Sequence, residues 1–179
     1  MITALRFRRF DPGEAAALAD FLAGEPWPFH AAETVQREDV LGRVAEGYYD
    51  DETYWIEIGG ERAGIVRLFD LEDETPMFDL RISARHRGKG LGRAAVQWLT
   101  DRLFGEYPHV ERIEGTTRQD NAAMRRVFGR CGYVKEAHYR RAWPDASGHR
   151  HDSVGYAIIR RDWQTGETTV PDFHDDQCP

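Results

Sequence analysis

The stretch MFDLRISARHRGKGLGRAAVQWLTDRLF, residues 77–104, joins three patterns in one continuous run. Residues 77–83 predict a strand, whereas apolar residues from Leu91 to Leu103 recur at helical spacing. Between them lies a loop rich in glycine and arginine, residues 84–93. A helix that begins after such a loop offers unpaired backbone N–H groups and the positive end of its dipole, so this segment predicts an anion site.

The composition of the loop favours a pyrophosphate as the bound anion. Glycines let a backbone approach a phosphate closely, and three are present at Gly88, Gly90 and Gly92. Cations can add charge-assisted hydrogen bonds. Four of them accompany the glycines: Arg85, Arg87, Lys89 and Arg93. The helix dipole alone contributes only about 0.3–1 kcal/mol. The affinity for the anion would therefore depend on the dipole, the backbone amides and the basic side chains together.

The glycine spacing separates this loop from two common nucleotide-binding motifs. A P-loop needs Gly-Lys-Ser/Thr after four intervening residues, but Gly90 is followed by Leu91. The dinucleotide motif GxGxxG needs a glycine where Arg93 stands. The spacing Arg85-x-x-Gly88-x-Gly90 instead resembles the Q/R-x-x-G-x-G/A signature of the GNAT N-acetyltransferase superfamily, which binds the pyrophosphate of CoA.

Segments further along extend this resemblance over nearly the whole chain. Residues 112–116 are similar to the superfamily's late strand, residues 120–128 to its asparagine-led helix, and residues 131–133 to its closing Gly-Phe/Tyr. The sequence most resembles the branch that contains the ribosomal-protein N-terminal acetyltransferases. That branch shares a strand glutamate before the helix asparagine and a late Asp-x-x-x-Tyr, here residues 152–156. Its members acetylate varied amines, so a ribosomal acceptor does not follow.

The patterns along the chain predict an α/β fold built as a single domain. Strands are expected at residues 1–10, 54–58, 63–71, 77–83, 111–117, 133–143 and 153–160, and helices at 15–22, 33–46, 91–103 and 121–131. The third helix follows the glycine-rich loop, and Asp120 is the expected cap of the fourth. Because a meander precedes alternating strands and helices, we expect a mostly antiparallel, twisted mixed sheet with helices on both faces. Residues 1–165 would form this domain and residues 166–179 a polar tail.

The bulk composition narrows the classes of partner. The chain has 179 residues, of which 41% are hydrophobic and 31% charged, a mixture typical of folded proteins. Its net charge of -7 argues against nucleic acid. No apolar run approaches the roughly 20 residues of a membrane span, and no signal peptide is evident, so we expect a cytoplasmic protein without a membrane partner. Two cysteines and scattered histidines predict no metal site.

The resemblance implies acetyl-CoA as the acetyl donor. A strand backbone would pair with the pantetheine arm and polarise the thioester carbonyl, and the loop amides would hold the pyrophosphate. The implied cofactor-binding residues are Leu80, Arg81, Ile82, Arg85, Arg87, Gly88, Lys89, Gly90, Leu91, Gly92, Arg93 and Asn121. The alternative for Asn121 is a residue that only caps its helix.

Direct attack by an amine requires the neutral form, so a base would help. The ordinary pKa is about 10.4 for a lysine-like amine and about 7.7–8.0 for an α-amine. Glu114 is the first candidate base, because it lies on the strand beside the expected cofactor cleft. Its alternative role is an ion pair with Arg112 or Arg118. Asp79 is the second candidate and His30 the third, and for both a structural role is favoured.

One departure from the superfamily concerns the departing CoA thiolate. Phe128 stands where many members have a tyrosine that can protonate it. Either water and backbone dipoles assist the thiolate, or another hydroxyl substitutes, from Tyr133 or Tyr139. The catalytic residues expected are therefore Glu114, Asp79 and Tyr133.

Trp27, Phe29 and His30 predict a substrate-binding wall on a loop, although packing over the core is an equal alternative. The function expected is N-acetylation of a primary amine: a small cationic amine, an aminoglycoside-like compound or a protein N-terminus. A catalytically silent acyl-CoA-binding module and an interaction protein using Trp27, Phe29 and Trp143 are the competing hypotheses. The oligomeric state, with a homodimer among the alternatives, stays open.

Overall fold

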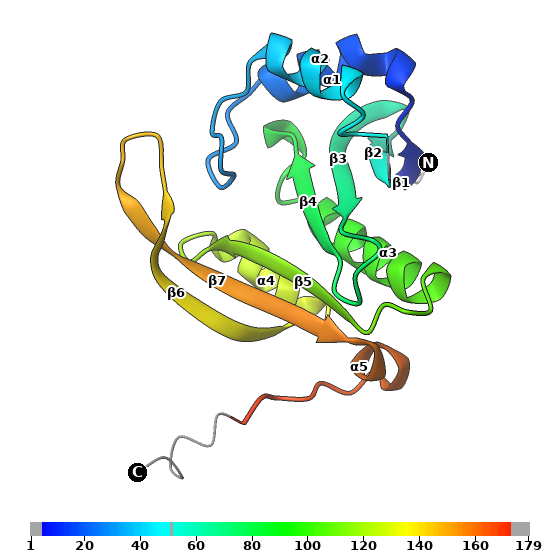
Figure 1. Cartoon of the computed structure of the whole chain (residues 1–179), viewed down its shortest axis with the longest axis vertical. Helices are drawn as coiled ribbons and strands as arrows, with labels where there is room; N and C mark the ends of the chain where they lie inside the picture. The colour runs from blue at the N-terminus through cyan, green and yellow to red at the C-terminus, as the bar shows by residue number, and fades with distance from the viewer. Residues whose placement is uncertain (1–4, 51, 173–179) are drawn as a thin grey trace.

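A seven-stranded mixed sheet in the order β1-β2-β3-β4-β5-β7-β6 organises the molecule (Figure 1). The computed structural model describes residues 5–50 and 52–172. Its strands are β1 (Leu5–Arg9), β2 (Thr53–Ile58), β3 (Glu61–Phe69), β4 (Met77–Ile82), β5 (Arg112–Arg118), β6 (Val134–Pro144) and β7 (Arg150–Ile159). Its helices are α1 (Ala15–Ala23), α2 (Arg37–Ala45), α3 (Leu91–Glu106), α4 (Ala122–Arg130) and α5 (Arg160–Thr165), with 3-10 turns η1 (Pro12–Glu14) and η2 (Ala84–His86). The expected mixed, mostly antiparallel sheet with helices is confirmed.

Alternation along the strands sends side chains into two separate cores, one on each face of the sheet. In β2, Trp55 packs into a cluster with residues of α1 and α2, whereas Tyr54 and Ile56 join α3 and α4. Figure 1 shows α1 and α2 lying together against the β1–β4 half of the sheet. The two helix pairs therefore cover opposite faces, as the sequence patterns predict.

The parallel neighbours β4 and β5 pair only where they begin. Met77 lies opposite Glu114 in their single register pair, and the Glu114 N–H donates to Pro76 O at 3.1 Å. Every other neighbouring pair in the sheet is antiparallel. Figure 1 shows β4 and β5 diverging beyond this point. Beyond this pair no register pair joins β4 and β5, and this separation of their backbones is the opening between the two halves of the sheet.

The hydrogen-bond pattern of β3 and β4 shows which backbone groups face this opening. The Ser83 N–H donates to Ala63 O at 2.9 Å, and in an antiparallel pair every second residue bonds its partner strand in this way. Arg81 therefore bonds β3, while the N–H and C=O of Leu80 point away from β3 towards β5. The edge of β4 that faces the opening thus carries polar backbone groups.

Two predictions of where helices begin differ from the structure. The helix expected from residue 33 begins at Arg37. The Trp27 N–H donates to Glu33 O at 2.6 Å, and residues 33–34 form a bend before the helix. Asn121, not Asp120, caps α4 by accepting from the Met124 N–H at 3.2 Å. Asp120 is instead held by an arginine, as described below.

A short helix, α5, follows the last strand and is not predicted from the sequence. The sequence patterns predict no element between the strand that ends at residue 160 and the tail that begins at residue 166. The Asp162 side chain there accepts from the N–H of Thr169 at 2.8 Å, so the beginning of the expected tail is anchored. Residues 173–179 of that tail, like residues 1–4 of the expected first strand, lie outside the described residues. The boundary at residue 165 stays a prediction.

Gly115 is required where the sheet meets α4. A Cβ at this position would lie 2.6 Å from Cζ of Phe128, a buried ring stacked on Tyr156 at 4.7 Å between centroids. We expect Gly115→Ala to reduce the free energy of unfolding by about 1–3 kcal/mol in urea denaturation, since the core cannot accommodate the methyl group.

Gly129→Ala is the control, because a Cβ there meets nothing within 4 Å and the residue lies in α4. It should stabilise the protein by up to about 1 kcal/mol. Equal stability of the wild type and Gly115→Ala would contradict the close packing of Phe128 on the sheet.

Candidate active site

The glycine-rich loop passes from β4 through η2 to the first turn of α3. Gly88 and Gly90 adopt positive φ angles of 75° and 85°, which glycine adopts without strain. Gly90 is the N-cap of α3 and provides no side chain, so the first N–H groups of the helix have no side-chain cap. No atom lies within 4 Å of a Cβ built at Gly88 or Gly90. Such open amides at the N-terminus of a 16-residue helix suit an anion.

The cations of the loop fall into two groups. Lys89 and Arg93 are exposed around it, and Arg85 is exposed as well but lies 3.3 Å from a carboxylate oxygen of Glu61. Arg87 is instead engaged: its Nε donates to Ile82 O at 2.8 Å and its guanidinium lies 3.2 Å from a carboxylate oxygen of Glu25. The same Glu25 oxygen accepts from the Ala84 N–H at 2.7 Å. Arg87 therefore anchors the loop to the segment after α1.

A histidine and an aspartate meet at the open edge of β4. His30 comes from the loop between α1 and α2, and its Nε2 lies 3.1 Å from Oδ1 of Asp79 and 3.2 Å from Leu80 O. Arg81 donates from Nε to Oδ2 of Asp79 at 3.1 Å. His30 thus bridges a side chain and a carbonyl of β4 beside the opening.

These neighbours determine the charge of Asp79. Burial by itself raises the pKa of this carboxyl, but the hydrogen bond from His30 and the positive charge of Arg81 outweigh it and lower the pKa to about 2. A base works best when its pKa lies near the working pH. Asp79 is therefore a stable carboxylate near neutrality and a weak proton acceptor.

Glu114 lies on the same face of the sheet as Asp79, because it pairs with Met77, two residues before it. Nη1 of Arg112 donates to its carboxylate at 2.7 Å, and Nη2 of the same arginine donates to Glu136 at 2.6 Å. The ion pair considered as the alternative for Glu114 is thus present, with Arg112 as the partner.

Of the three aromatic positions considered for thiolate protonation, Phe128 and Tyr133 are buried. Phe128 has no hydroxyl and packs in the core. The Tyr133 hydroxyl lies 2.9 Å from Oγ1 of Thr100 on α3, and burial raises the pKa of Tyr133. Tyr139, in contrast, is 51% exposed on β6. In this arrangement the Tyr133 hydroxyl serves the packing of α3 rather than the opening between β4 and β5.

Asn121 lies between the end of β5 and the first turn of α4. Its Oδ1 caps α4, and its Nδ2 donates to Oγ1 of Thr117 on β5 at 3.0 Å. Both polar groups of the side chain are therefore used within the protein, which is the alternative considered for this residue.

A cavity of about 280 Å³ lies between the α1–α2 loop and the β6–β7 hairpin. Figure 1 shows that loop extending towards the hairpin. Residues from three segments line the cavity, among them Pro28, His30, Glu33, Arg118, Trp143 and Asp145. Its wall combines two carboxylates, of which Asp145 already contacts His151 at 2.8 Å, with the Arg118 guanidinium and an aromatic ring. The carboxylates outnumber the guanidinium, and a cationic group can also contact the ring.

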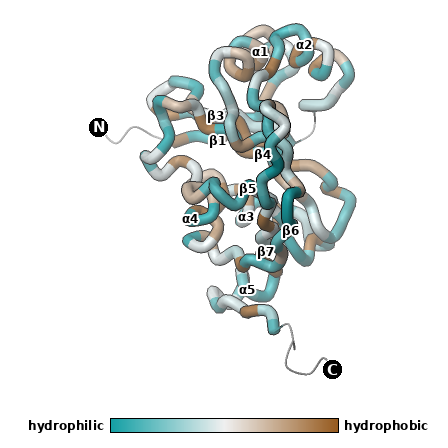
Figure 2. Tube along the Cα trace, turned by 90° about the vertical axis from the view of Figure 1, so that its left-hand side faces the viewer, coloured by the Kyte–Doolittle hydropathy of each residue, from teal (hydrophilic) through white to brown (hydrophobic). Residues whose placement is uncertain are grey.

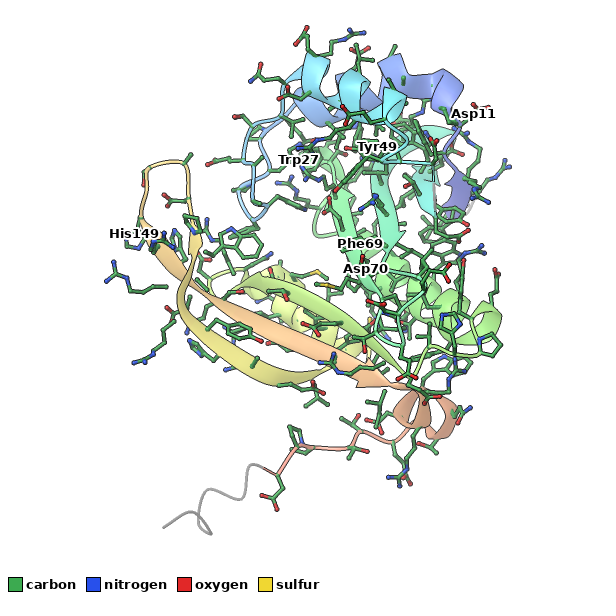
Figure 3. All side chains as sticks on the ribbon, in the orientation of Figure 1. Asp11, Trp27, Tyr49, Phe69, Asp70 and His149 are labelled. Atoms are coloured by element: carbon green, nitrogen blue, oxygen red, sulfur yellow. The ribbon has the colours of Figure 1, made fainter. Side chains whose placement is uncertain are left out.

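The predicted aromatic wall is only partly assembled. His30 lines the cavity, whereas Trp27 is 1% exposed and donates from Nε1 to Leu22 O at 2.8 Å. Phe29 lies under the guanidinium of Arg118. Figure 3 shows Trp27 beneath the α1–α2 pair and His149 on the hairpin. Trp27 therefore supports the loop from below.

Two features missed in the sequence are the contributions of Arg118 and Asp145 to this cavity. Arg118 meets Pro28, which is 90 residues away in the chain, so no local pattern reports the contact. The Asp-x-Ser turn at Asp145 is a recognisable signal, because its carboxylate accepts from the Ser147 N–H at 2.9 Å.

Comparison with known proteins identifies the family. A model of the acetyltransferase (GNAT) family matches residues 15–133. The chain belongs to the GNAT acetyltransferase family. In this GNAT domain the matched region runs from α1 to the end of α4 and includes the glycine-rich loop and β5.

Curated relatives match this GNAT domain over less than half its length. It is 32% identical over 88 residues to N-acetyltransferase 8F1 of Rattus norvegicus, which is 45% of this chain and 39% of that protein. N-acetyltransferase 8 of the same organism is 28% identical over 86 residues, 43% of this chain and 38% of the relative. The matches thus span about two fifths of the length of these relatives.

Solved structures share the fold of this GNAT domain at low sequence identity. The spermidine N-acetyltransferase from Vibrio cholerae in complex with CoA and spermine has a TM-score of 0.77 at 18% identity, covering 89% of this chain and 98% of that one. The ribosomal L7/L12 alpha-N-protein acetyltransferase in complex with coenzyme A has a TM-score of 0.75 at 19% identity, covering 89% and 95%.

Two further findings concern the described part of this GNAT domain. Among residues 5–50 and 52–172, no helix is long and apolar enough to cross a membrane. The same residues contain no group of three or more His, Cys, Asp or Glu side chains arranged to hold a metal ion.

The low pKa of Asp79 predicts a pH-dependent contribution to stability. A carboxyl whose folded pKa of about 2 lies below its ordinary value of about 3.9 stabilises the fold above pH 4 and loses this effect as the pH falls towards 2. We expect Asp79→Asn to unfold at lower urea concentration than the wild type at pH 7. The difference between the two proteins in the urea concentration at which they unfold should become smaller below about pH 4.

Asp20→Asn is the control, because Asp20 pairs with Arg37 at an exposed surface, where such pairs contribute little. A difference between wild type and Asp79→Asn that stays constant from pH 7 to pH 3 would contradict the stabilisation of the charged form.

Proposed function

We propose that the protein transfers the acetyl group of acetyl-CoA to a primary amine. The observation that carries this proposal is the continuity between the open edge of β4 and the uncapped N-terminus of α3. A linear ligand with a pyrophosphate at one end and an acyl group at the other can contact both without leaving the surface. Membership of the GNAT family and the two CoA-containing solved structures of the same fold support this assignment.

The backbone of Leu80 is the group that we assign to the donor's arm. Its N–H and C=O face the opening, and Ile82, two residues further along, continues the same edge into the loop, whereas the backbone of Arg81 bonds β3. The amides of residues 87–93 would then hold the pyrophosphate, with Arg85, Lys89 and Arg93 adding charge-assisted bonds. When bound, acetyl-CoA supplies an activated acyl thioester. Alignment of an amine beside it makes the attack effectively intramolecular.

The acceptor is assigned to the cavity between the α1–α2 loop and the hairpin. His30 connects the two parts of the site, because it lines this cavity and contacts Leu80 O. Glu33 and Asp145 attract a cationic molecule to it, and Trp143 offers an aromatic face. A cavity of about 280 Å³ is small for a whole drug-sized ligand, so the acceptor would insert one end only.

The state of the candidate bases favours one kind of amine. Asp79 is held at low pKa, Glu114 is paired with Arg112, and Nε2 of His30 faces two oxygen atoms. An acceptor that is already partly neutral therefore fits best. An α-amine is neutral about one time in ten near pH 7, and a lysine-like amine only a few times in ten thousand. We thus place a peptide N-terminus or another amine of similar pKa before a polyamine or lysine.

A second candidate function is a silent acyl-CoA-binding module. Phe128 lacks the hydroxyl that many superfamily members have at this position, and the hydroxyl of Tyr133 is bonded to Thr100. Departure of the thiolate would then depend on water and backbone dipoles. Binding of acetyl-CoA without transfer is the property that separates this candidate from the enzyme.

The experiment is an acetylation assay by mass spectrometry with acetyl-CoA and three acceptor classes: peptides with free N-termini, polyamines and aminoglycosides. We expect acetylated peptide, with a rate that rises from pH 6 to pH 8 as the α-amine loses its proton. Gly90→Glu should reduce acetyl-CoA affinity at least about 30-fold, because it adds repulsion and removes charge-assisted bonds worth about 1.5–3 kcal/mol each.

Gly90→Ala is the matched control: it imposes the same backbone strain at a φ of 85° without the charge, and should bind acetyl-CoA more tightly than Gly90→Glu. Acetyl-CoA binding without product in all three classes would identify the silent module. Wild-type protein that neither binds acetyl-CoA nor forms product would refute both functions.

A further inference from the structure

Arg118, the last residue of β5, makes contacts in three directions from a side chain that is only 12% exposed. Its Nη1 donates to Pro28 O in the α1–α2 loop at 3.0 Å, and its guanidinium carbon lies 5.1 Å from the centre of the Phe29 ring. Its Nε and Nη2 both donate to the carboxylate of Asp120, at 2.9 and 2.5 Å. One guanidinium thus fixes the loop to the beginning of α4.

The contacts continue from Asp120 to the β6–β7 hairpin. Nδ1 of His151 lies 3.9 Å from the Asp120 carboxylate, which is an ion-pair distance and not a hydrogen bond, and Nε2 of His151 lies 2.8 Å from Oδ2 of Asp145. The other oxygen of Asp145 accepts from the N–H groups of Ser147 and His149, at 2.9 and 3.0 Å. The turn of the hairpin is therefore organised around the carboxylate that ends this chain of polar contacts.

The two ends of the chain lie on opposite walls of the acceptor cavity. Pro28 belongs to one wall, Asp145 to the other, and Arg118 lines the cavity between them. The trace of β6 is coloured mostly teal, for hydrophilic residues, in Figure 2, and Trp143 and Pro144 are the apolar residues that this strand brings to the cavity. The hydrogen bonds of Arg118 join the loop to a residue that precedes α4, beside this wall.

We propose that Arg118 is a positioning residue for the acceptor: by tying Pro28 to Asp120, and through His151 to Asp145, it sets the width of the acceptor cavity. This proposal rests on the proposed function, because it concerns the same cavity. Arg118 does not touch the groups assigned to the donor. Replacement of Arg118 should lower kcat/KM for the acceptor and leave the binding of acetyl-CoA unchanged.

The chemistry of the side chain makes arginine necessary here. A guanidinium presents five N–H donors in a planar fork, so it can bond a carboxylate with two nitrogens and a carbonyl with a third. A lysine ammonium at the same position is a single point on a flexible stem. It can keep the charge near Asp120 but cannot maintain the fork and the bond to Pro28 O together.

The test compares wild type, Arg118→Lys and Asp120→Asn by hydrogen exchange and by steady-state kinetics. We expect faster exchange of the backbone amides of residues 29–34 in both variants, since either change weakens the fixation of the loop. With an acceptor that the wild type acetylates, kcat/KM for that acceptor should fall about tenfold to a hundredfold, because misplacement of the reactant is costly. The KM for acetyl-CoA should stay within about twofold.

Arg37→Lys is the matched control, because Arg37 also joins α1 and α2 through an aspartate, Asp20, but at an exposed position away from the cavity. It should change neither exchange nor kinetics. Unchanged exchange at residues 29–34 in Arg118→Lys would overturn the proposal, as would an equal loss of affinity for acetyl-CoA and acceptor. If the wild type acetylates no amine, the proposed function fails, and hydrogen exchange alone decides the role of Arg118.

Discussion

The structure depends on one interruption of its central sheet, the separation of β4 from β5 after the pair Met77 and Glu114. A parallel pair that continued would use the N–H and C=O of Leu80 in the ladder. The separation leaves the N–H of Leu80 facing an opening in the middle of the molecule, beside the C=O that Nε2 of His30 contacts at 3.2 Å, and a ligand can complete the hydrogen bonds that the sheet omits. The same strand leads directly into the glycine-rich loop and α3, so the opening and the anion site form one continuous surface.

The charged groups beside this opening are largely neutralised by one another. Asp79 is held by His30 and Arg81, and Glu114 by Arg112. The neighbours of Asp79 lower its pKa and with it the tendency of this carboxylate to accept a proton, and the ion pair with Arg112 fixes the position of the Glu114 carboxylate. This is the physical basis for expecting an acceptor amine that deprotonates close to neutral pH. The site would act mainly by alignment.

The sequence alone predicts the structure correctly where a local pattern of residues determines the backbone geometry. The loop of Gly88 and Gly90, the strand before it and the helix after it were predictable, because backbone conformation and spacing are encoded in adjacent residues. Long-range contacts decided the remainder. Nothing near Tyr133 in the chain announces its bond to Thr100, and the role of Arg118 depends on Pro28, 90 residues away. Asp120 was predicted to cap α4, but Arg118 binds its carboxylate, and Asn121 caps the helix instead.

Backbone amide exchange of Leu80, followed residue by residue by NMR, is the most direct measurement of the central claim. The Leu80 N–H should exchange faster than that of Arg81, which bonds β3, and it should become protected when acetyl-CoA is added. A Leu80 amide that is as protected as Arg81 in the absence of acetyl-CoA, and that is unaffected by its addition, would contradict the role of the β4 edge in binding the donor.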